Sequence, residues 1–134
     1  MFYGSMRKKK MPIETYFISG HLDLSDEEFK EYYVPQIESA LSENARFVVG
    51  DARGADCLAQ AYLAGKTASV TVYHMYNSPR NNAGFKTKGG FKSDNSRDRQ
   101  MTLDSTQDIA WVRQTRNHSG TQRNLDRRMA LKVK

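Results

Sequence analysis

This sequence lacks the features of a disulfide-linked, metal-binding or membrane-spanning protein. Cys57 is the single cysteine, which excludes an internal disulfide and a multi-cysteine zinc site. No apolar run approaches the ~20 residues that cross a bilayer, and no apolar stretch follows the basic N-terminal residues as in a secretory signal. The three histidines are not spaced as metal ligands usually are. We therefore expect a cytoplasmic protein with no membrane partner, no metal and no cofactor.

The chain is short and has a positive net charge. Its 134 residues have room for one domain, which we expect to span residues 12–134 after a disordered segment at 1–11. Lys and Arg outnumber Asp and Glu by 21 to 15, and basic residues are concentrated in 80–99 and in the C-terminal tail. This excess favours a polyanionic partner or a phosphorylated ligand, and charge alone does not choose between them.

Apolar residues follow the periodicity of strands and of helices in alternation. The pattern predicts strands at residues 15–19, 46–49, 70–74 and 108–112. It predicts helices after Ser25, over residues 55–64 and 94–103, and from 118 onward. Ser25 and Glu28 form a capping box, and Pro35 should kink or divide the helix that follows. Strands that alternate with helices predict an α/β fold, a single Rossmann-like doubly wound domain with a mainly parallel sheet.

The last strand and the last helix supply expected core residues. Trp111 lies in an apolar strand, so we expect it in the core, and Leu125 and Met129 should form the apolar stripe of the last helix. His74 ends a strand and is expected to be structural.

Residues 76–93 are rich in Asn, Gly, Lys and Ser, which predicts a mobile loop. Phe85 and Phe91 stand among lysines within it. Three interpretations stay open: a solvated loop, a lid over a ligand site, or a surface on which nucleic-acid bases stack.

The most informative segment is residues 47–56, with the sequence FVVGDARGAD. A short apolar strand runs into a turn between Gly50 and Gly54, and a helical pattern begins directly afterwards. Free backbone N–H groups and the positive end of the helix dipole favour an anion at such a place, and glycine permits positive φ or close approach. The alternative is an ordinary turn between a strand and a helix without a ligand.

Other segments that follow predicted strands should meet this turn. Ligands of doubly wound sheets bind outside the carboxyl ends of the strands. Gly20 and His21 follow the first strand, and residues 119–121 (Ser-Gly-Thr) open the last helix. His21 stands where the base or ribose of a ligand would lie, with a solvated loop histidine as the alternative, and His118 stands next to the Gly-Thr turn.

Three motifs resemble the SLOG superfamily of Rossmann-like proteins, over roughly residues 16–129. They are the turn at 50–56, the sequence RDRQM at 97–101, and Gly-Thr at 120–121. The superfamily includes the Lonely Guy phosphoribohydrolases, DNA-processing protein A and small bacterial proteins of the YspA and YpsA type. The resemblance implies a nucleotide or nucleotide-derived ligand and a homo-oligomer.

The resemblance also implies roles for single residues. Arg97 would face phosphate or sugar, because the arginine fork suits phosphate oxygens. The other residues that the resemblance and the turn chemistry assign to ligand binding are Gly20, His21, Gly50, Asp51, Arg53, Gly54, Asp56, Ser119, Gly120 and Thr121.

Asn124 departs from the pattern of the phosphoribohydrolases. It stands where they have a catalytic glutamate, and residues 117–119 replace their Pro-Gly-Gly. An amide neither takes a proton nor stabilises a sugar cation by charge. Three carboxylates remain as substitutes, namely Asp51, Asp56 and Asp98.

The sequence therefore predicts a domain that binds a nucleotide or nucleotide-derived molecule at the carboxyl edge of its sheet. Whether it is an enzyme stays open; if it cleaves the ligand, hydrolysis of an N-glycosidic bond is the expected reaction. One alternative is a protein that binds single-stranded nucleic acid, as DNA-processing protein A does. Another is a non-catalytic sensor or sequestering protein for a signalling nucleotide.

Overall fold

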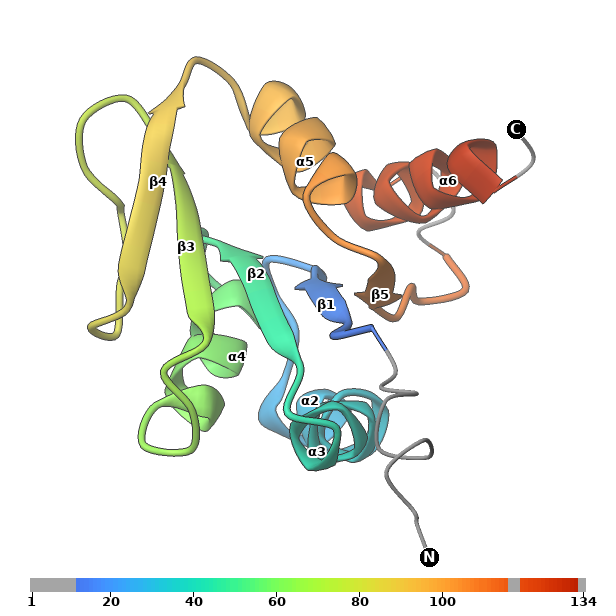
Figure 1. Cartoon of the computed structure of the whole chain (residues 1–134). Coiled ribbons are helices and arrows are strands. Elements are labelled where there is room, and N and C mark those ends of the chain that lie inside the picture. Colours follow the sequence, from blue (N-terminus) through green and yellow to red (C-terminus); the bar gives the residue numbers. More distant parts are fainter. Residues whose placement is uncertain (1–11, 116–118, 133–134) are drawn as a thin grey trace, which may run out of the picture.

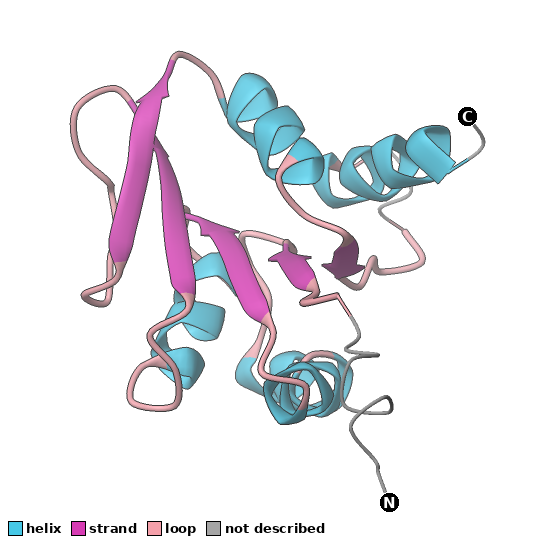
Figure 2. Ribbon diagram, in the orientation of Figure 1, coloured by secondary structure: helices cyan, strands magenta, loops and turns pink. Residues whose placement is uncertain are grey.

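Five parallel strands form the sheet around which the other elements are arranged (Figures 1 and 2). In this computed structural model the described residues are 12–115 and 119–132. The strand order across the sheet is β4-β3-β2-β1-β5. The doubly wound α/β fold predicted from the alternating pattern is thereby confirmed. The strands are β1 (Thr15–Ile18), β2 (Arg46–Gly50), β3 (Val70–Met75), β4 (Lys86–Phe91) and β5 (Gln107–Ile109).

Helices cover both faces of the sheet (Figure 1). On one face lie α2 (Asp26–Tyr32), α3 (Val34–Ser42) and α4 (Ala55–Leu63), and on the other lie α5 (Asp94–Leu103) and α6 (Gly120–Lys132). The neighbouring strands β1 and β5 thus lead into helices on opposite faces, which defines the switch point of a doubly wound sheet. None of the described helices has the length and apolar character needed to cross a membrane.

The junction of α2 and α3 follows the sequence signals closely. The Ser25 hydroxyl accepts a hydrogen bond from the Glu28 N–H, and the Glu28 carboxylate accepts one from the Ser25 N–H, both at 3.0 Å. Pro35 lies in the first turn of α3, where a missing N–H is harmless, so the helix is divided as predicted. Tyr33 at the junction is fully buried; its hydroxyl donates to the Ser19 carbonyl at 2.8 Å and accepts from the Trp111 N–H at 3.1 Å.

The apolar core lies mainly between the sheet and α2, α3 and α4. Phe29, Ile37 and Leu63 on these helices pack with Phe47 and Val49 of β2. The opposite face has a smaller cluster, made by Phe17, Val48, Tyr73 and Met101. Burial of apolar area on the first face therefore supplies most of the hydrophobic stabilisation.

The prediction of a mobile loop over residues 76–93 was wrong for its second half. Lys86–Phe91 forms β4, which pairs with β3 in parallel at the edge of the sheet. Its first five residues are exposed, so it shows no apolar alternation from which a strand could be recognised. Gly89 lies against the His74 ring, where an added Cβ would come within 2.0 Å of Cε1. The glycine that suggested a loop is thus required for strand packing, and His74 is structural as expected.

The C-terminal elements differ from expectation in two respects. β5 ends at Ile109, so Trp111 lies beyond the strand, partly buried, with its ring stacked on Tyr32 at 4.2 Å between centroids. The expected apolar stripe of α6 was wrong: Met129 is 62% exposed. The residues that α6 buries are polar instead, namely Thr121, Asn124 and Arg128.

Candidate functional site

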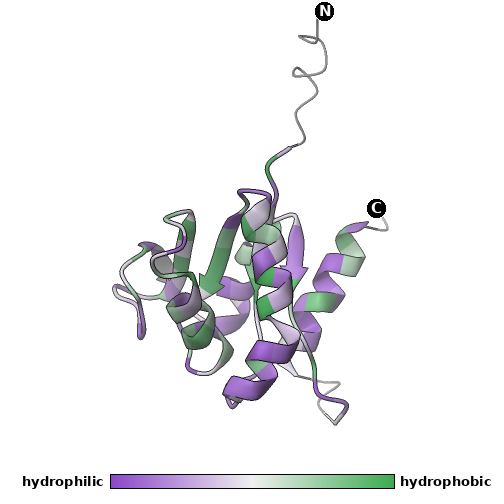
Figure 3. Cartoon of the chain, turned by 90° about the horizontal axis from the view of Figure 1, so that it is seen from below, coloured by the Kyte–Doolittle hydropathy of each residue, from purple (hydrophilic) through white to green (hydrophobic). Residues whose placement is uncertain are grey.

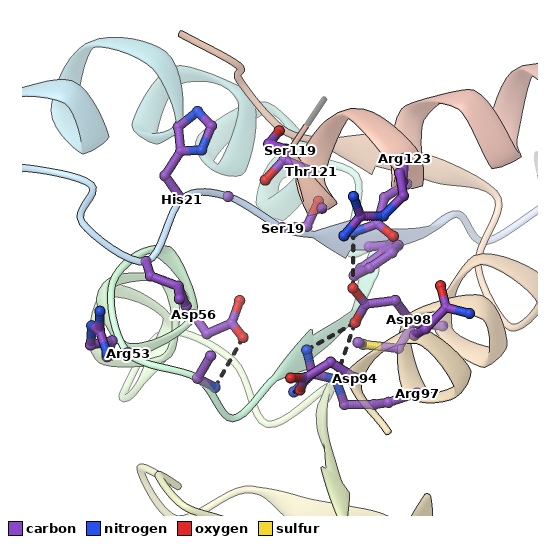
Figure 4. A pocket seen from close by; sticks show the side chains of 18 of the residues that line it. Ser19, His21, Arg53, Asp56, Asp94, Arg97, Asp98, Ser119, Thr121 and Arg123 are labelled. Atoms are coloured by element: carbon purple, nitrogen blue, oxygen red, sulfur yellow. Dashed lines mark hydrogen bonds and ion pairs between the residues drawn. The ribbon is translucent and has the colours of Figure 1, made fainter. Parts of the chain in front are cut away.

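A pocket of about 760 Å³ lies at the carboxyl edge of the sheet, at the switch point (Figure 4). Its wall comes from the end of β1, the turn between β2 and α4, helix α5 and the start of α6. Pockets of this size hold cofactors and drug-sized ligands. The segments that were expected to meet at one edge of the sheet therefore do meet there.

Most of the residues singled out in the sequence line this pocket. Gly50, Asp51 and Gly54 do not line the pocket, but they lie against residues that do. Those in its lining are Gly20, His21, Arg53, Asp56, Arg97, Asp98, Ser119, Gly120 and Thr121.

Gly54 fixes the turn that leads into α4. Its φ is +77°, and an added Cβ would lie 2.3 Å from the carbonyl oxygen of Leu22. Directly after it, the Ala55 N–H donates to the His21 carbonyl at 3.1 Å. Glycine at this position thus lets the β2–α4 turn lie directly against the segment that follows β1.

Gly50 permits an equally close approach of side chains. An added Cβ there would lie 2.5 Å from Asp56 Oδ2 and 3.0 Å from the central carbon of the Arg97 guanidinium. The end of β2 is therefore the surface on which these two side chains rest.

Asp51 is the counter-ion behind the pocket wall. It is 1% exposed and accepts hydrogen bonds from Arg97 Nη1 and Arg80 Nη2, each at 2.8 Å. Burial opposes ionisation, but the hydrogen bonds from Arg80 outweigh it and hold the pKa of Asp51 below its ordinary value. Asp51 is thus a positioning residue for two arginines, and it does not face the pocket.

Arg97 uses its N–H groups within the protein. Its Nη1 binds Asp51, and its Nε and Nη2 both donate to Asp98 Oδ1, at 3.1 and 2.9 Å. Only 6% of the side chain is exposed. We expected Arg97 to face phosphate or sugar; in the structure its guanidinium orients carboxylates at the pocket wall.

Asp56 is buried on the α4 side of the pocket. Its Oδ2 accepts from the Ala52 N–H at 3.1 Å, and the residue is 7% exposed. Burial raises the pKa of Asp56 to about 7, although the charge of Arg97 opposes the shift. Near neutral pH this side chain is therefore partly protonated and can donate as well as accept.

Asn124 connects α6 to α5. Its amide N–H donates to Asp98 Oδ2 at 3.3 Å, and its amide oxygen accepts from Arg127. Arg127 in turn donates to Asn95 on α5. Asn124, which stands where the phosphoribohydrolases have a glutamate, is thus hydrogen-bonded to the carboxylate of Asp98.

The start of α6 forms another wall of the pocket. Ser119 caps the helix, since its hydroxyl accepts from the Gln122 N–H at 3.1 Å. Gly120 and Thr121 precede that residue, and N–H groups in a first helical turn have no partner within the helix. Thr121 is itself 5% exposed.

Ser19 presents an unsatisfied hydroxyl to the pocket. The residue is 6% exposed and lines the pocket, and its Oγ has no hydrogen-bond partner among the described residues. Buried hydroxyls nearly always have a partner, because an unmade hydrogen bond costs about 1–3 kcal/mol. A ligand that hydrogen-bonds to Ser19 would remove this cost.

His21 is buried, unlike a solvated loop histidine. Its Nε2 accepts from the Arg113 N–H at 3.0 Å, and its ring lies edge-on to Trp111. Arg113 also forms ion pairs with Asp23 and Glu28. The histidine therefore joins the segment after β1 to the segment after β5 while lining the pocket.

Some pocket residues were not singled out from the sequence. In the sequence Arg123 and Arg127 are typical of a solvated helix face, yet both line the pocket. They follow Gly120 at intervals of three and seven, so helical spacing could have placed them on the face of the helix start. Ser19 gave no such signal, because it reads as the end of a strand.

Some expectations fall outside what the structure describes. His118 and the segment 1–11 lie outside the described residues. Within residues 12–115 and 119–132, no group of three or more His, Cys, Asp or Glu side chains is arranged to hold a metal ion.

Comparisons with protein-family models, with characterised proteins and with solved structures find no match. The likeness to SLOG proteins accordingly rests on the motifs at 50–56, 97–101 and 120–121.

Proposed function

We propose that this protein binds a nucleotide or nucleotide-derived small molecule in the pocket at the carboxyl edge of its sheet. The observation that carries the proposal is the unsatisfied Ser19 hydroxyl, buried in the same pocket as the start of α6. A helix start favours an anion, and an unpaired buried hydroxyl favours a second polar group on the same ligand. A phosphate joined to a polar sugar or base meets both requirements.

Arginines on two sides of the pocket support a phosphorylated ligand. Arg53 lies on the β2–α4 turn and is exposed, and Arg123 and Arg127 lie in the first turns of α6. Guanidinium groups bind phosphate oxygens through paired N–H donors. We assign phosphate contacts to these residues and to the N–H groups of Gly120 and Thr121, rather than to Arg97.

A single-stranded nucleic-acid ligand has less support. Besides the positive net charge, that alternative relies on Phe85 and Phe91 in a mobile segment as rings on which bases stack. In the structure Phe91 stacks on Tyr73 at 5.9 Å between centroids, and Phe85 packs against the main core. Rings held in this way present little surface to nucleic-acid bases.

The proposal is tested by thermal unfolding and calorimetry with a panel of nucleosides and nucleoside mono-, di- and triphosphates. At least one phosphorylated compound should raise the melting temperature. Ser19→Ala removes the hydroxyl without removing a contact of the unliganded protein. It should leave stability unchanged or raise it slightly, and weaken binding of that compound about tenfold.

Asp126→Asn is the matched control. Asp126 lies on the exposed side of α6 and bonds only Gln122 among the described residues. This variant should bind like the wild type. No stabilising compound in the panel, or equal binding by Ser19→Ala, would overturn the proposal.

A further inference from the structure

Asp56 is a buried acid with one oxygen left for a ligand. The residue is 7% exposed and lines the pocket, and in Figure 4 its carboxylate points into the cavity from the α4 side. Oδ2 accepts a hydrogen bond from the Ala52 N–H at 3.1 Å, whereas Oδ1 has no hydrogen-bond partner among the described residues. A buried polar atom without a partner destabilises the unliganded protein, so Oδ1 favours a ligand that hydrogen-bonds to it.

Ser19 places a second unpartnered group on the same wall of the pocket. Its hydroxyl is buried and makes no hydrogen bond to a described residue. The next residue, Gly20, lies against the start of α4, since an added Cβ would come within 2.5 Å of the Ala55 Cβ, and Ala55 precedes Asp56. The end of β1 and the start of α4 therefore touch, and each presents one polar group with unused hydrogen-bonding capacity.

The charges that act on Asp56 are mainly negative. They come from Asp98 on α5 and Asp51 after β2, and the one cation among them, Arg97, is hydrogen-bonded to both of these carboxylates. The other titratable or charged residues of the surrounding elements are Tyr33, Cys57, His21 and the exposed Arg53. A phosphate bound directly to Asp56 would lie beside two carboxylates, so we expect the uncharged sugar or base of a nucleotide at this position.

Burial favours the neutral form of this acid. It raises the pKa of Asp56 to about 7, and Asp98 and Asp51 add to the shift while Arg97 opposes it. Because Oδ2 accepts the Ala52 N–H, the proton of the neutral acid belongs on Oδ1, the oxygen without a partner. The neutral carboxyl donates a hydrogen bond from that oxygen, whereas the ionised carboxylate only accepts.

We propose that Asp56 binds the nucleotide as a neutral acid, with its Oδ1–H donating a hydrogen bond to an uncharged acceptor of the sugar or base, so that nucleotide binding requires a proton on this residue. The inference rests on the proposed function, because a nucleotide must occupy the pocket. It makes Asp56 the residue through which pH controls the affinity of the site.

The expected pH dependence follows from the protonated fraction of Asp56. A ligand that binds only the protonated form loses affinity as pH rises through the pKa of the free protein. With a pKa of about 7, the protonated fraction falls about tenfold from pH 6 to pH 8. Nucleotide affinity should fall by the same factor.

The test is calorimetry at pH 6, 7 and 8 with the 5′-mono-, di- and triphosphates of adenosine, guanosine, cytidine and uridine. Titration at pH 8 in buffers of small and large ionisation enthalpy gives the number of protons taken up on binding. A terminal phosphate with a pKa of about 6 is already ionised at this pH. Wild type should therefore take up nearly one proton per bound nucleotide, and that proton goes to Asp56.

Asp56→Asn is the matched variant. The Ala52 N–H should hold the amide oxygen as it holds Oδ2, which leaves the NH₂ group as a donor that cannot titrate. The ratio of wild-type to variant affinity should fall about tenfold from pH 6 to pH 8, and ionisation of the ligand cancels in that ratio. The variant should take up no proton at pH 8, whereas Ser19→Ala and the control Asp126→Asn should take up as many as wild type.

Ribose 5-phosphate and inorganic phosphate locate the acceptor. Proton uptake that persists with ribose 5-phosphate assigns the acceptor to the sugar, and its loss assigns the acceptor to the base. Inorganic phosphate should bind without proton uptake at pH 8. Uptake with inorganic phosphate would show that Asp56 contacts the anion, and would overturn the assignment of an uncharged acceptor.

The outcomes separate this inference from the proposed function. A nucleotide that binds wild type at pH 8 without proton uptake overturns the role of Asp56 and leaves the binding function standing. Equal pH dependence in wild type and Asp56→Asn also overturns it. Failure of every nucleotide to bind overturns the proposed function, and this inference with it. Proton uptake by wild type is scored first, so the decision does not depend on the variant folding.

Discussion

The two faces of the sheet are built from different chemistry. On the face of α2, α3 and α4 most buried side chains are apolar, with Ile37 and Leu63 fully buried, and the buried polar residues Asp56 and Gln60 lie on α4 alone among these helices. On the face of α5 and α6 the helices bury Arg97, Asn124 and Arg128. In Figure 3, α6, the helix that ends at the C-terminus, is coloured mostly as hydrophilic.

We infer from this difference that the face of α2, α3 and α4 supplies most of the stability and that the face of α5 and α6 contributes more to the candidate site. A buried apolar side chain needs no specific partner. A buried polar group without a hydrogen bond lowers the free energy of unfolding. The face of α5 and α6, where buried polar groups need hydrogen bonds, also supplies much of the pocket lining. We expect substitutions on the first face to change stability most, and substitutions near the pocket to show effects that depend on charge and pH.

The largest effect is expected from Phe47→Ala on the apolar face. Phe47 is 1% exposed in the main core, and truncation of a buried phenylalanine costs about 3–5 kcal/mol. Met129→Ala on α6 is the control, because Met129 is 62% exposed and should change stability by less than about 0.5 kcal/mol. Urea unfolding followed by circular dichroism measures both, and equal losses would contradict the contrast between the faces.

A smaller loss is expected at the glycine where the segments after β1 and β2 meet. Gly54→Ala combines a positive φ with a Cβ placed 2.3 Å from the Leu22 carbonyl oxygen, and should cost about 3 kcal/mol. Gly65→Ala has a similar φ of +83° but no atom within 4 Å, and should cost about 1 kcal/mol. If the two variants unfold at the same urea concentration, the close approach at Gly54 does not constrain the fold.

The buried counter-ion behind the pocket should contribute less. Asp51→Asn keeps the shape of the side chain but leaves Arg97 with less negative charge, at a cost of about 2 kcal/mol at pH 7. Because the pKa of Asp51 is lowered in the folded state, its stabilisation is present above pH ~4 and is lost as pH falls below that value. The difference between wild type and variant should therefore shrink in acid.

Asp94→Asn is the control for that measurement. Asp94 contacts the same arginines, but its side chain is 60% exposed. Exposed pairs contribute about 0–1 kcal/mol, so this variant should be close to wild type at every pH. A loss equal to that of Asp51→Asn would mean that burial of the pair is irrelevant.

The contrast between the faces also explains what the sequence could predict. Periodicity predicted the elements of the apolar face, because regularly spaced apolar side chains lie on one side of a helix or strand and are buried there. Periodicity did not predict β4, because nearly all of its side chains are exposed. Its Gly89 suggested a loop, but a glycine is needed there because the His74 ring leaves no room for a Cβ. Periodicity failed for the inner side of α6 as well, since Arg128 and Asn124 look like solvated residues until their partners on α5 and β5 are known.

The site was predictable in membership but not in role. Glycine turns after strands predicted several of the residues that line the pocket, at residues 20–21, 53–56 and 119–121. Contacts between elements then decided the roles: Asp51 and Arg97 pair with each other, 46 positions apart in the chain. No local pattern indicates such a pair, or that Ser19 has no partner for its hydroxyl.

The smallest predicted effect is a pH dependence of stability that arises from Asp56. Its pKa is about 7 in the folded protein and about 4 in an unfolded chain, so the folded state holds the proton more tightly between these values. Stability therefore falls as pH rises through this window, and levels off above pH 7. From pH 6 to 8 this group should cost the wild type on the order of 1 kcal/mol.

Asp56→Asn has no proton to lose, so its stability should not show this fall. All other titratable groups are present in both proteins, so their contributions cancel in the difference. Urea unfolding of wild type and variant at pH 6, 7 and 8 gives that difference, with the variant gaining relative stability at each step. A constant difference would mean that Asp56 is charged over the whole range from pH 6 to 8 and that burial does not raise its pKa.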